Sequence, residues 1–122
     1  MKLHLNTTAG QNTIFAHGQG YIDINGVRHT EPVLLSPDWL HSPWQVGDIA
    51  ALQLSDFAAL LARKPTIVVF GSGVTFQFPD MRILAAFSQA QIGFEVMDTG
   101  AACRTYNVLM SEGRDVAAAL FI

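Results

Sequence analysis

Side chains that could do chemistry crowd into residues 96–107, VMDTGAACRTYN, which hold a carboxylate, the only cysteine of the chain, an arginine and an asparagine. The pattern predicts that Asp98 or Thr99 caps a helix whose free N–H groups and dipole favour an anion. Gly100 leaves that helix end unobstructed, and Arg104 would supply a counter-charge. The segment is therefore a candidate anion-binding turn.

The same residues also fit a structural role. Asp98 and Thr99 would then only cap the helix, Arg104 would pair with Asp98 or Glu112, and Asn107 would satisfy a buried backbone group. Helix N-termini are common and most of them bind only water. Both interpretations stay open from the sequence.

Cys103 is a candidate nucleophile, because a thiol in the first turn of a helix beside an arginine has a lowered pKa. Catalytic thiols usually need a histidine base, and the four histidines all lie in the N-terminal third: His4, His17, His29 and His41. We therefore expect Cys103 to be a small packing residue and assign no catalytic residue. The histidines lack metal-ligand spacing, so we expect neither a metal nor a cofactor.

A second glycine-containing turn, Gly71-Ser72-Gly73, follows the apolar run TIVVF. It lacks the last glycine of GxGxxG and the lysine of a P-loop, which disfavours a nucleotide. Both turns follow runs that we predict to be neighbouring parallel strands, so they should meet at one edge of a sheet. The candidate ligand-binding residues are Gly71, Ser72, Gly73, Asp98, Thr99, Gly100, Cys103, Arg104 and Asn107.

Composition limits the classes of protein. A chain of 122 residues fits one domain over 1–122, and 50% hydrophobic residues can form its core. The net charge of −3 and the scattered basic residues disfavour a nucleic-acid partner. Apolar runs are too short to cross a bilayer, and the strand-like start at 2–6 differs from a leader sequence, so we expect a cytoplasmic protein without membrane insertion.

The N-terminal half predicts a β-hairpin whose turn is Asn25-Gly26, because both residues tolerate positive φ. Its arms should run from about 13 to 24 and from 27 to 35, with a bulge or bend at Gly18 and Gly20. We expect the segment 36–48 to be a long connection anchored by its two tryptophans. A two-residue loop fixes three pairs across the hairpin: Ile24 with Val27, Asp23 with Arg28, and Ile22 with His29.

The C-terminal half alternates between helical and strand-like patterns. Helices are expected at 54–64, capped by Ser55, at 79–91, with Pro79 in the first turn and Gly93 ending it, and at 100–113, closed by Gly113. Strands are expected at 66–71, 94–98 and 115–122. The order predicts an α/β fold with three parallel strands, and the hairpin either joins this sheet or forms a second layer.

The runs TIVVFGSG and GFEVMDTGAACRTYNVLMSEGRDVAAALFI resemble the small Mth-type domain family of undefined activity, which includes bacterial proteins of this length and the mitochondrial complex I assembly factor three. The family usually shows GTG where this chain has Gly71-Ser72-Gly73, so a hydroxyl is kept between the glycines. The resemblance implies a single three-layer α/β domain with a mixed central sheet. It supplies no catalytic residues.

The mitochondrial relatives act through protein partners, so the resemblance favours a non-catalytic binding or assembly role, with respiratory complex biogenesis as one setting. We treat an enzyme as the less favoured class. The alternative is an enzyme that binds a small anion through 71–73 and 98–107. The apolar C-terminal strand and the low surface charge are compatible with a homodimer.

Overall fold

The structure is a computed structural model that describes residues 10–122, and it contains two β-sheets and three α-helices. The antiparallel three-stranded sheet consists of β1 (Ile14–Gly18), β2 (Tyr21–Ile24) and β3 (Val27–His29). The mixed five-stranded sheet, in the order β5-β4-β8-β6-β7, consists of β4 (Val33–Ser36), β5 (Trp39–His41), β6 (Ile67–Ser72), β7 (Gly93–Met97) and β8 (Val116–Phe121). The helices are α2 (Ala58–Arg63), α3 (Met81–Gln89) and α4 (Thr99–Ser111), and the 3₁₀ turns are η1 (Ile49–Ala51) and η2 (Leu54–Phe57).

The C-terminal half has the predicted parallel arrangement. β6 lies between β7 and β8 and pairs with both in parallel, from Ile67 opposite Gly93 and Val116 onward. β6 and β8 are continuous apolar runs because these inner strands are covered on both faces, whereas β7 lies at the edge of the sheet and is only partly buried. The expected order of helices and strands from residue 54 to the C-terminus is confirmed.

The predicted hairpin forms with the expected register. Asn25 has φ of 50° and Gly26 has φ of 84°, as a tight turn with positive φ at both positions requires. Arg28 donates two hydrogen bonds to Asp23, from Nε at 2.9 Å and from Nη2 at 3.2 Å. Ile22 and Ile24 lie buried on the opposite face.

The limits of the hairpin arms were predicted wrongly. Gly18 and Gly20 belong to a turn that reverses the chain between β1 and β2, and a Cβ on Gly18 would approach the Tyr21 ring to 2.5 Å. The second arm ends at His29, and β4 joins the larger sheet beside β8. Segment 36–48 contains β5 and is therefore more than a connection, although Trp44 is buried in the core as expected.

Three predicted helix boundaries were also wrong. The 3₁₀ turn η2 precedes α2, and Ser55 lies within this turn, so Ser55 does not cap the helix. The residue that caps η2 is Gln53, whose backbone N donates to the Asp56 carboxylate. Asp80 caps α3 by accepting from Arg82 N, which leaves Pro79 outside the helix. Gln91, with φ of 60°, reverses the chain after α3, and Gly93 already belongs to β7.

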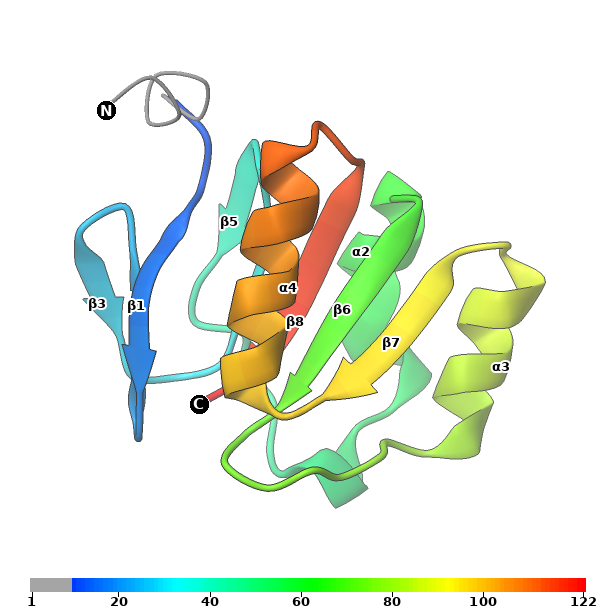
Figure 1. The fold of residues 1–122 in the computed structure, drawn as a ribbon. Helices are drawn as coiled ribbons and strands as arrows, with labels where there is room; N and C mark the ends of the chain where they lie inside the picture. The colour runs from blue at the N-terminus through cyan, green and yellow to red at the C-terminus, as the bar shows by residue number, and fades with distance from the viewer. Residues whose placement is uncertain (1–9) are drawn as a thin grey trace.

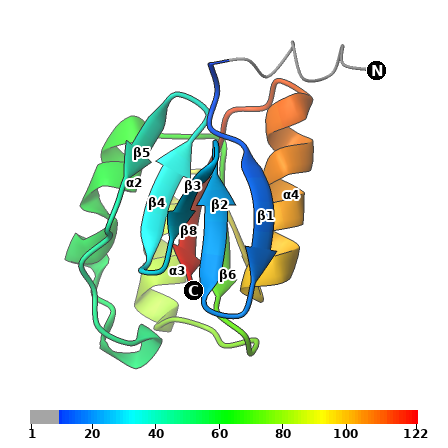
Figure 2. The same cartoon turned by 90° about the vertical axis from the view of Figure 1, so that its left-hand side faces the viewer.

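Three layers enclose two hydrophobic clusters (Figure 1). α2 and α3 cover one face of the five-stranded sheet, while α4 and the three-stranded sheet lie side by side on the other face (Figure 2). β8 illustrates the alternation, since Ala117 and Phe121 face the α2 and α3 side and Ala118 and Leu120 face α4. The three-stranded sheet therefore forms the second layer that the sequence left as one of two options. The strand-like segment 2–6 and His4 lie outside the described residues.

Candidate functional site

The two candidate turns meet at the carboxyl edge of the five-stranded sheet, as predicted. Gly71 of β6 lies opposite Met97 of β7, so both strands end together. The backbone N of Thr99 donates to Gly73 O at 2.9 Å, and Gly73 N donates to Thr99 Oγ1 at 2.7 Å. The turns are thus bonded directly to each other.

Thr99 also connects this pair of turns to a third strand. Its hydroxyl donates to the carbonyl of Phe121 in β8 at 2.6 Å while it accepts from Gly73 N. The side chain is nearly buried, so neither backbone group could turn to water in its place. Thr99 therefore holds the ends of β6 and β8 at the start of α4.

Each residue of the Gly71-Ser72-Gly73 turn has its own structural role. A Cβ on Gly71 would lie 2.9 Å from Leu120 Cδ2 and 2.9 Å from Thr99 Oγ1, so only glycine fits between β8 and α4. Ser72 Oγ donates to Thr75 O at 2.6 Å and accepts from Gln77 N at 3.1 Å. Gly73 has φ of 97°, which strongly favours glycine.

The N-terminus of α4 is largely occupied by the protein itself. Asp98 Oδ1 accepts from Ala101 N at 2.9 Å, and the Asp98 carbonyl accepts from Ala102 N. Since the amide of Thr99 is bonded to Gly73, these three donors are unavailable to an anion. Gly100 and Arg104 lie close together, with Arg104 Nη1 3.6 Å from the point where a Gly100 Cβ would be.

Cys103 is fully buried in the core between α4 and the sheets. Burial raises the pKa of its thiol to about 12, and the opposing effect of Arg104 is smaller. The thiol therefore stays protonated at neutral pH and has no access to a substrate. Its expected role as a packing residue agrees with this position.

Asn107 binds the backbone of β1, as the structural interpretation requires. Its Oδ1 accepts from Ile14 N at 3.0 Å and its Nδ2 donates to Ile14 O at 2.7 Å, so the side chain replaces a neighbouring strand. The adjacent Tyr106 donates from its hydroxyl to Asn12 O at 2.8 Å. Arg104 forms an ion pair with neither Asp98 nor Glu112, the two described residues that the structural interpretation offered as partners, and Glu112 instead approaches Arg114 at 3.7 Å.

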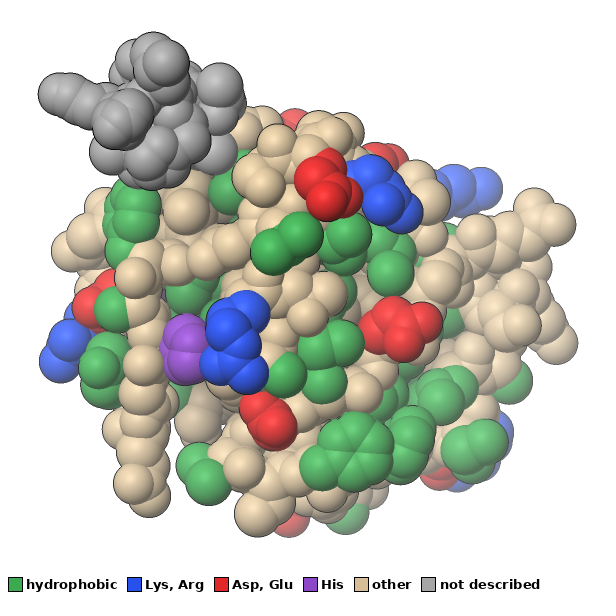
Figure 3. Space-filling view, viewed as in Figure 1, with side chains coloured by type: hydrophobic (Ala, Val, Ile, Leu, Met, Phe, Trp, Pro, Cys, Tyr) green, Lys and Arg blue, Asp and Glu red, His purple; other side chains and the backbone are tan. Residues whose placement is uncertain are grey.

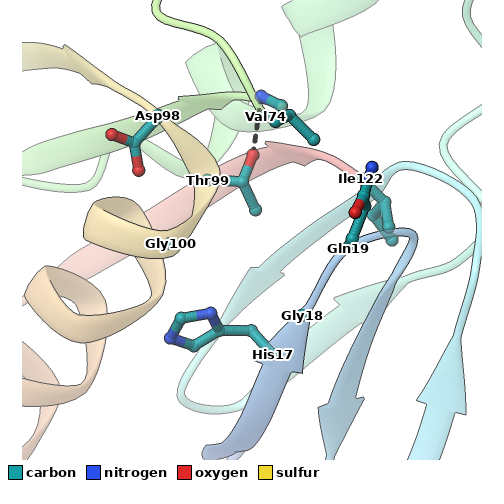
Figure 4. Close-up of a pocket in the computed structure, with 9 residues that line it drawn as sticks. His17, Gly18, Gln19, Val74, Asp98, Thr99, Gly100 and Ile122 are labelled. Atoms are coloured by element: carbon teal, nitrogen blue, oxygen red, sulfur yellow. Dashed lines mark hydrogen bonds between the residues drawn. The ribbon is translucent and has the colours of Figure 1, made fainter.

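A small open hollow of about 200 Å³ lies beside the joined turns (Figure 4). Four predicted site residues line it, namely Gly73, Asp98, Thr99 and Gly100. The other five, which are Gly71, Ser72, Cys103, Arg104 and Asn107, do not line it. Its remaining lining comes from His17, Gly18, Gln19, Val74 and Ile122. No local sequence pattern places the β1–β2 turn here, because that turn belongs to the other sheet.

An exposed apolar surface lies on the loop that leaves this hollow. We call Val74, Phe76, Phe78 and Met81 the apolar loop surface, and their exposed fractions are 70%, 58%, 54% and 70%. In Figure 3, hydrophobic side chains gather along the lower edge of the molecule, where the loop from β6 to α3 runs. The sequence analysis missed this surface, although the spaced aromatics in VTFQFPDM are a signal that could have found it.

Among residues 10–122, no group of three histidine, cysteine, aspartate or glutamate side chains is placed to hold a metal ion. No helix in this same part of the chain has the length and apolar character needed to cross a membrane.

Comparison with known proteins identifies the family. A model of a family described as a protein of unknown function, DUF498/DUF598, matches residues 14–121. The chain belongs to this family. A solved Bordetella pertussis structure described as a Mth938-like domain is 28% identical, with a TM-score of 0.79 over 93% of this chain and 87% of that one, which confirms the resemblance seen in the sequence.

Other DUF498/DUF598 relatives include a human protein named NADH dehydrogenase [ubiquinone] 1 alpha subcomplex assembly factor 3, which is 39% identical over 101 residues. That match covers 80% of this chain and 53% of the human protein, so the chain spans about half the length of this relative. The 13 kDa major membrane protein of Francisella tularensis is 28% identical over 100 residues, with 81% of each chain covered. A Xanthomonas campestris structure is 35% identical, with a TM-score of 0.85 over 100% of this chain and 92% of that one.

Proposed function

We propose that this DUF498/DUF598 protein is a non-catalytic binding protein that assists assembly of an NADH dehydrogenase complex. The observation that carries the proposal is the apolar loop surface, because four large apolar side chains exposed on one segment, two of them with their rings in contact, are typical of an interaction site. The assembly-factor relatives support the same role. The surface lies at the carboxyl edge of the parallel strands, the edge at which α/β folds commonly bind ligands.

The alternative, an enzyme that binds a small anion at 71–73 and 98–107, is less well supported. The amides of Gly73, Thr99 and Ala101 already donate within the protein. The Asp98 carboxylate also lines the hollow, and its charge opposes an anion. An adjacent arginine alone does not make a specific anion site.

A gene deletion in the source organism tests the proposed role. Native gel electrophoresis of its membranes, stained for NADH dehydrogenase activity, should show loss of the assembled complex and accumulation of smaller species. Re-expression of the wild-type chain should restore the complex, whereas a chain with Phe76→Asp and Phe78→Asp should not. The matched control is Phe15→Asp, which changes a phenylalanine that is 61% exposed on β1, away from the apolar loop surface.

An intact complex in the deletion strain would refute the assembly role. We also propose the cytoplasmic location and the homodimer that the sequence analysis expects. Cell fractionation and sedimentation of the native protein test them directly, and recovery with washed membranes would place the protein where the name of the Francisella relative points.

A further inference from the structure

The turn between β2 and β3 carries a reactive pair of residues. Asn25 is followed by Gly26, whereas the other three asparagines of the chain precede threonine or valine. An asparagine side chain is open to attack by the backbone N of the next residue, and a glycine there has no side chain to hinder the attack. Both turn residues are exposed, and a Cβ placed on Gly26 would meet no atom of residues 10–122 within 4 Å. Asn25 is therefore the asparagine that is chemically best placed for this reaction.

The folded chain holds the side chain of Asn25 in place. Asn25 Oδ1 accepts from Thr13 N at 3.0 Å, Asn25 Nδ2 donates to Asn12 Oδ1 at 3.1 Å, and Asn25 N donates to Thr13 O at 3.1 Å. These bonds join the end of β2 to the segment that enters β1 beside it (Figure 2). Since both polar atoms of the side-chain amide are bound to this segment, its carbonyl carbon is restrained from turning toward Gly26 N.

The orientation of Asn12 is fixed from its other side. Asn12 Nδ2 donates to Ser36 O at 2.9 Å and to Trp39 O at 3.0 Å, in the hairpin that β4 and β5 form. Two carbonyl acceptors require the NH₂ group at this position, so the side chain cannot turn over without losing both bonds. Asn12 Oδ1 is therefore held as the acceptor that faces Asn25.

We propose that Asn25 is a site of covalent modification, at which spontaneous deamidation is restrained by Asn12 and Thr13 in the folded protein. Gly26 N gives up its proton to a solvent base and attacks Asn25 Cγ, so that a new C–N bond forms. The bond from Cγ to Nδ2 breaks, and the amide nitrogen takes up a proton and leaves as ammonia. Water then opens the succinimide at one of its two carbonyls and yields aspartate or isoaspartate. The side chain is released when segment 12–13 opens, so the rate of deamidation follows that local opening.

The products change the contact between the hairpin and segment 12–13. An aspartate at this position still accepts from Thr13 N, but it presents an oxygen to Asn12 Oδ1, where two acceptors meet without a proton between them. Isoaspartate also adds a carbon to the main chain, which a two-residue turn with a fixed register cannot absorb. Deamidation therefore weakens the bonds that hold the hairpin to the start of β1.

Peptide mapping by mass spectrometry tests the site on the whole chain. The wild type is incubated at mildly alkaline pH, once folded and once unfolded in urea, and aspartate and isoaspartate are quantified at each asparagine. Conversion should concentrate at Asn25 and should be at least about tenfold faster in urea, because the three hydrogen bonds that hold the residue are lost. Asn12 and Asn107 in the same sample are internal controls and should convert far more slowly.

Asn12→Ala tests the restraint itself. The change removes the acceptor of Asn25 Nδ2, so deamidation of the folded protein at Asn25 should become about three to ten times faster, while the rate in urea stays that of the wild type. The matched control is Ser111→Ala, which removes a hydrogen bond at the exposed end of α4 and should leave the rate unchanged. Gly26→Ala should slow the reaction in urea, where the strain of an alanine at a φ of 84° is absent.

Three results would overturn the proposal. They are faster conversion at another asparagine, equal rates at Asn25 in the folded and unfolded wild type, and an unchanged rate in Asn12→Ala when thermal unfolding shows that this variant folds. The first two results need only the wild type, so they decide the matter even if the variant does not fold.

A double-mutant cycle tests the predicted effect of the product. Asn25→Asp should lower the midpoint of thermal unfolding more in the wild-type chain than in Asn12→Ala, because the facing oxygen is absent from the second background. Equal shifts in the two backgrounds would contradict the repulsion between the oxygens.

Discussion

At the scale of single residues, the DTGAACRTYN run illustrates how a polar cluster can serve the fold. Asp98 caps α4, Thr99 joins three strand ends and Asn107 holds β1. Cys103 fills the core beside them. Gly100 and Arg104 remain near the hollow without such a role in the fold. The chemical variety of the run therefore reflects several separate contacts, made by one helix with its different neighbours.

Thr99→Val tests the role of the hydroxyl at almost constant side-chain volume. The change leaves Gly73 N and Phe121 O without their partner in a nearly buried position, so the free energy of unfolding should fall by about 2–3 kcal/mol. Urea unfolding followed by circular dichroism measures the loss. Thr99→Ser keeps the hydroxyl and should lose less than half as much. A loss in Thr99→Val no larger than that in Thr99→Ser would contradict the role of the hydroxyl.

At the scale of elements, periodicity predicted more of the C-terminal half than of the N-terminal half. The continuous run IVVFGS and the helical spacing of Ile83 and Phe87 depend on burial along one element, which a single sequence shows. The path of the chain after His29 depends on whether the next strand pairs within the three-stranded sheet or within the five-stranded sheet. A short apolar strand such as β4 gives no local signal for that choice, so the long second arm was predicted wrongly.

The candidate site, like the fold, was predicted only in part from the sequence. Parallel strand exits brought Gly73 and Thr99 together as expected, because that follows from topology. The position of His17 in the hollow depends on how the three-stranded sheet packs against α4, which no local pattern specifies.

Asn107→Ala should loosen the three-stranded sheet from α4. The change removes both hydrogen bonds to the Ile14 backbone, at a cost of about 1–3 kcal/mol, and no strand among residues 10–122 pairs with β1 on that side to replace them. Hydrogen exchange should therefore accelerate at the Ile14 amide and along β1, with little change in β6. Ser111→Ala, which removes a bond within α4 at the exposed end, is the control. Uniform acceleration in both sheets would indicate global destabilisation and contradict a local attachment.

At the scale of the whole molecule, folding and binding use different regions. The layers are joined by buried clusters on both faces of the five-stranded sheet, while the apolar loop surface lies outside both clusters. Because these side chains contribute little to the core, they can be substituted without a loss of the fold. The residues with the most polar chemistry therefore stabilise the fold, while the apolar residues for which partner binding is proposed lie apart from the core.

The core that joins the two sheets also makes the free energy of unfolding depend on pH in the alkaline range. Burial raises the pKa of Cys103 from 9.0 to about 12 and raises that of Tyr106 above its ordinary value of 10.0. The native state therefore keeps protons that the unfolded chain releases, so the stability present below pH 9 should fall above it by up to about 1.4 kcal/mol per pH unit for each group. Urea unfolding at pH 8, 9 and 10 should show this fall in the wild type. Cys103→Ala, although less stable at pH 8, should lose less between pH 9 and 10, where the tyrosine of the unfolded chain is at most half deprotonated. Parallel pH profiles for the two proteins would show that the thiol is exposed to solvent in the native state, contrary to its buried position between α4 and the sheets.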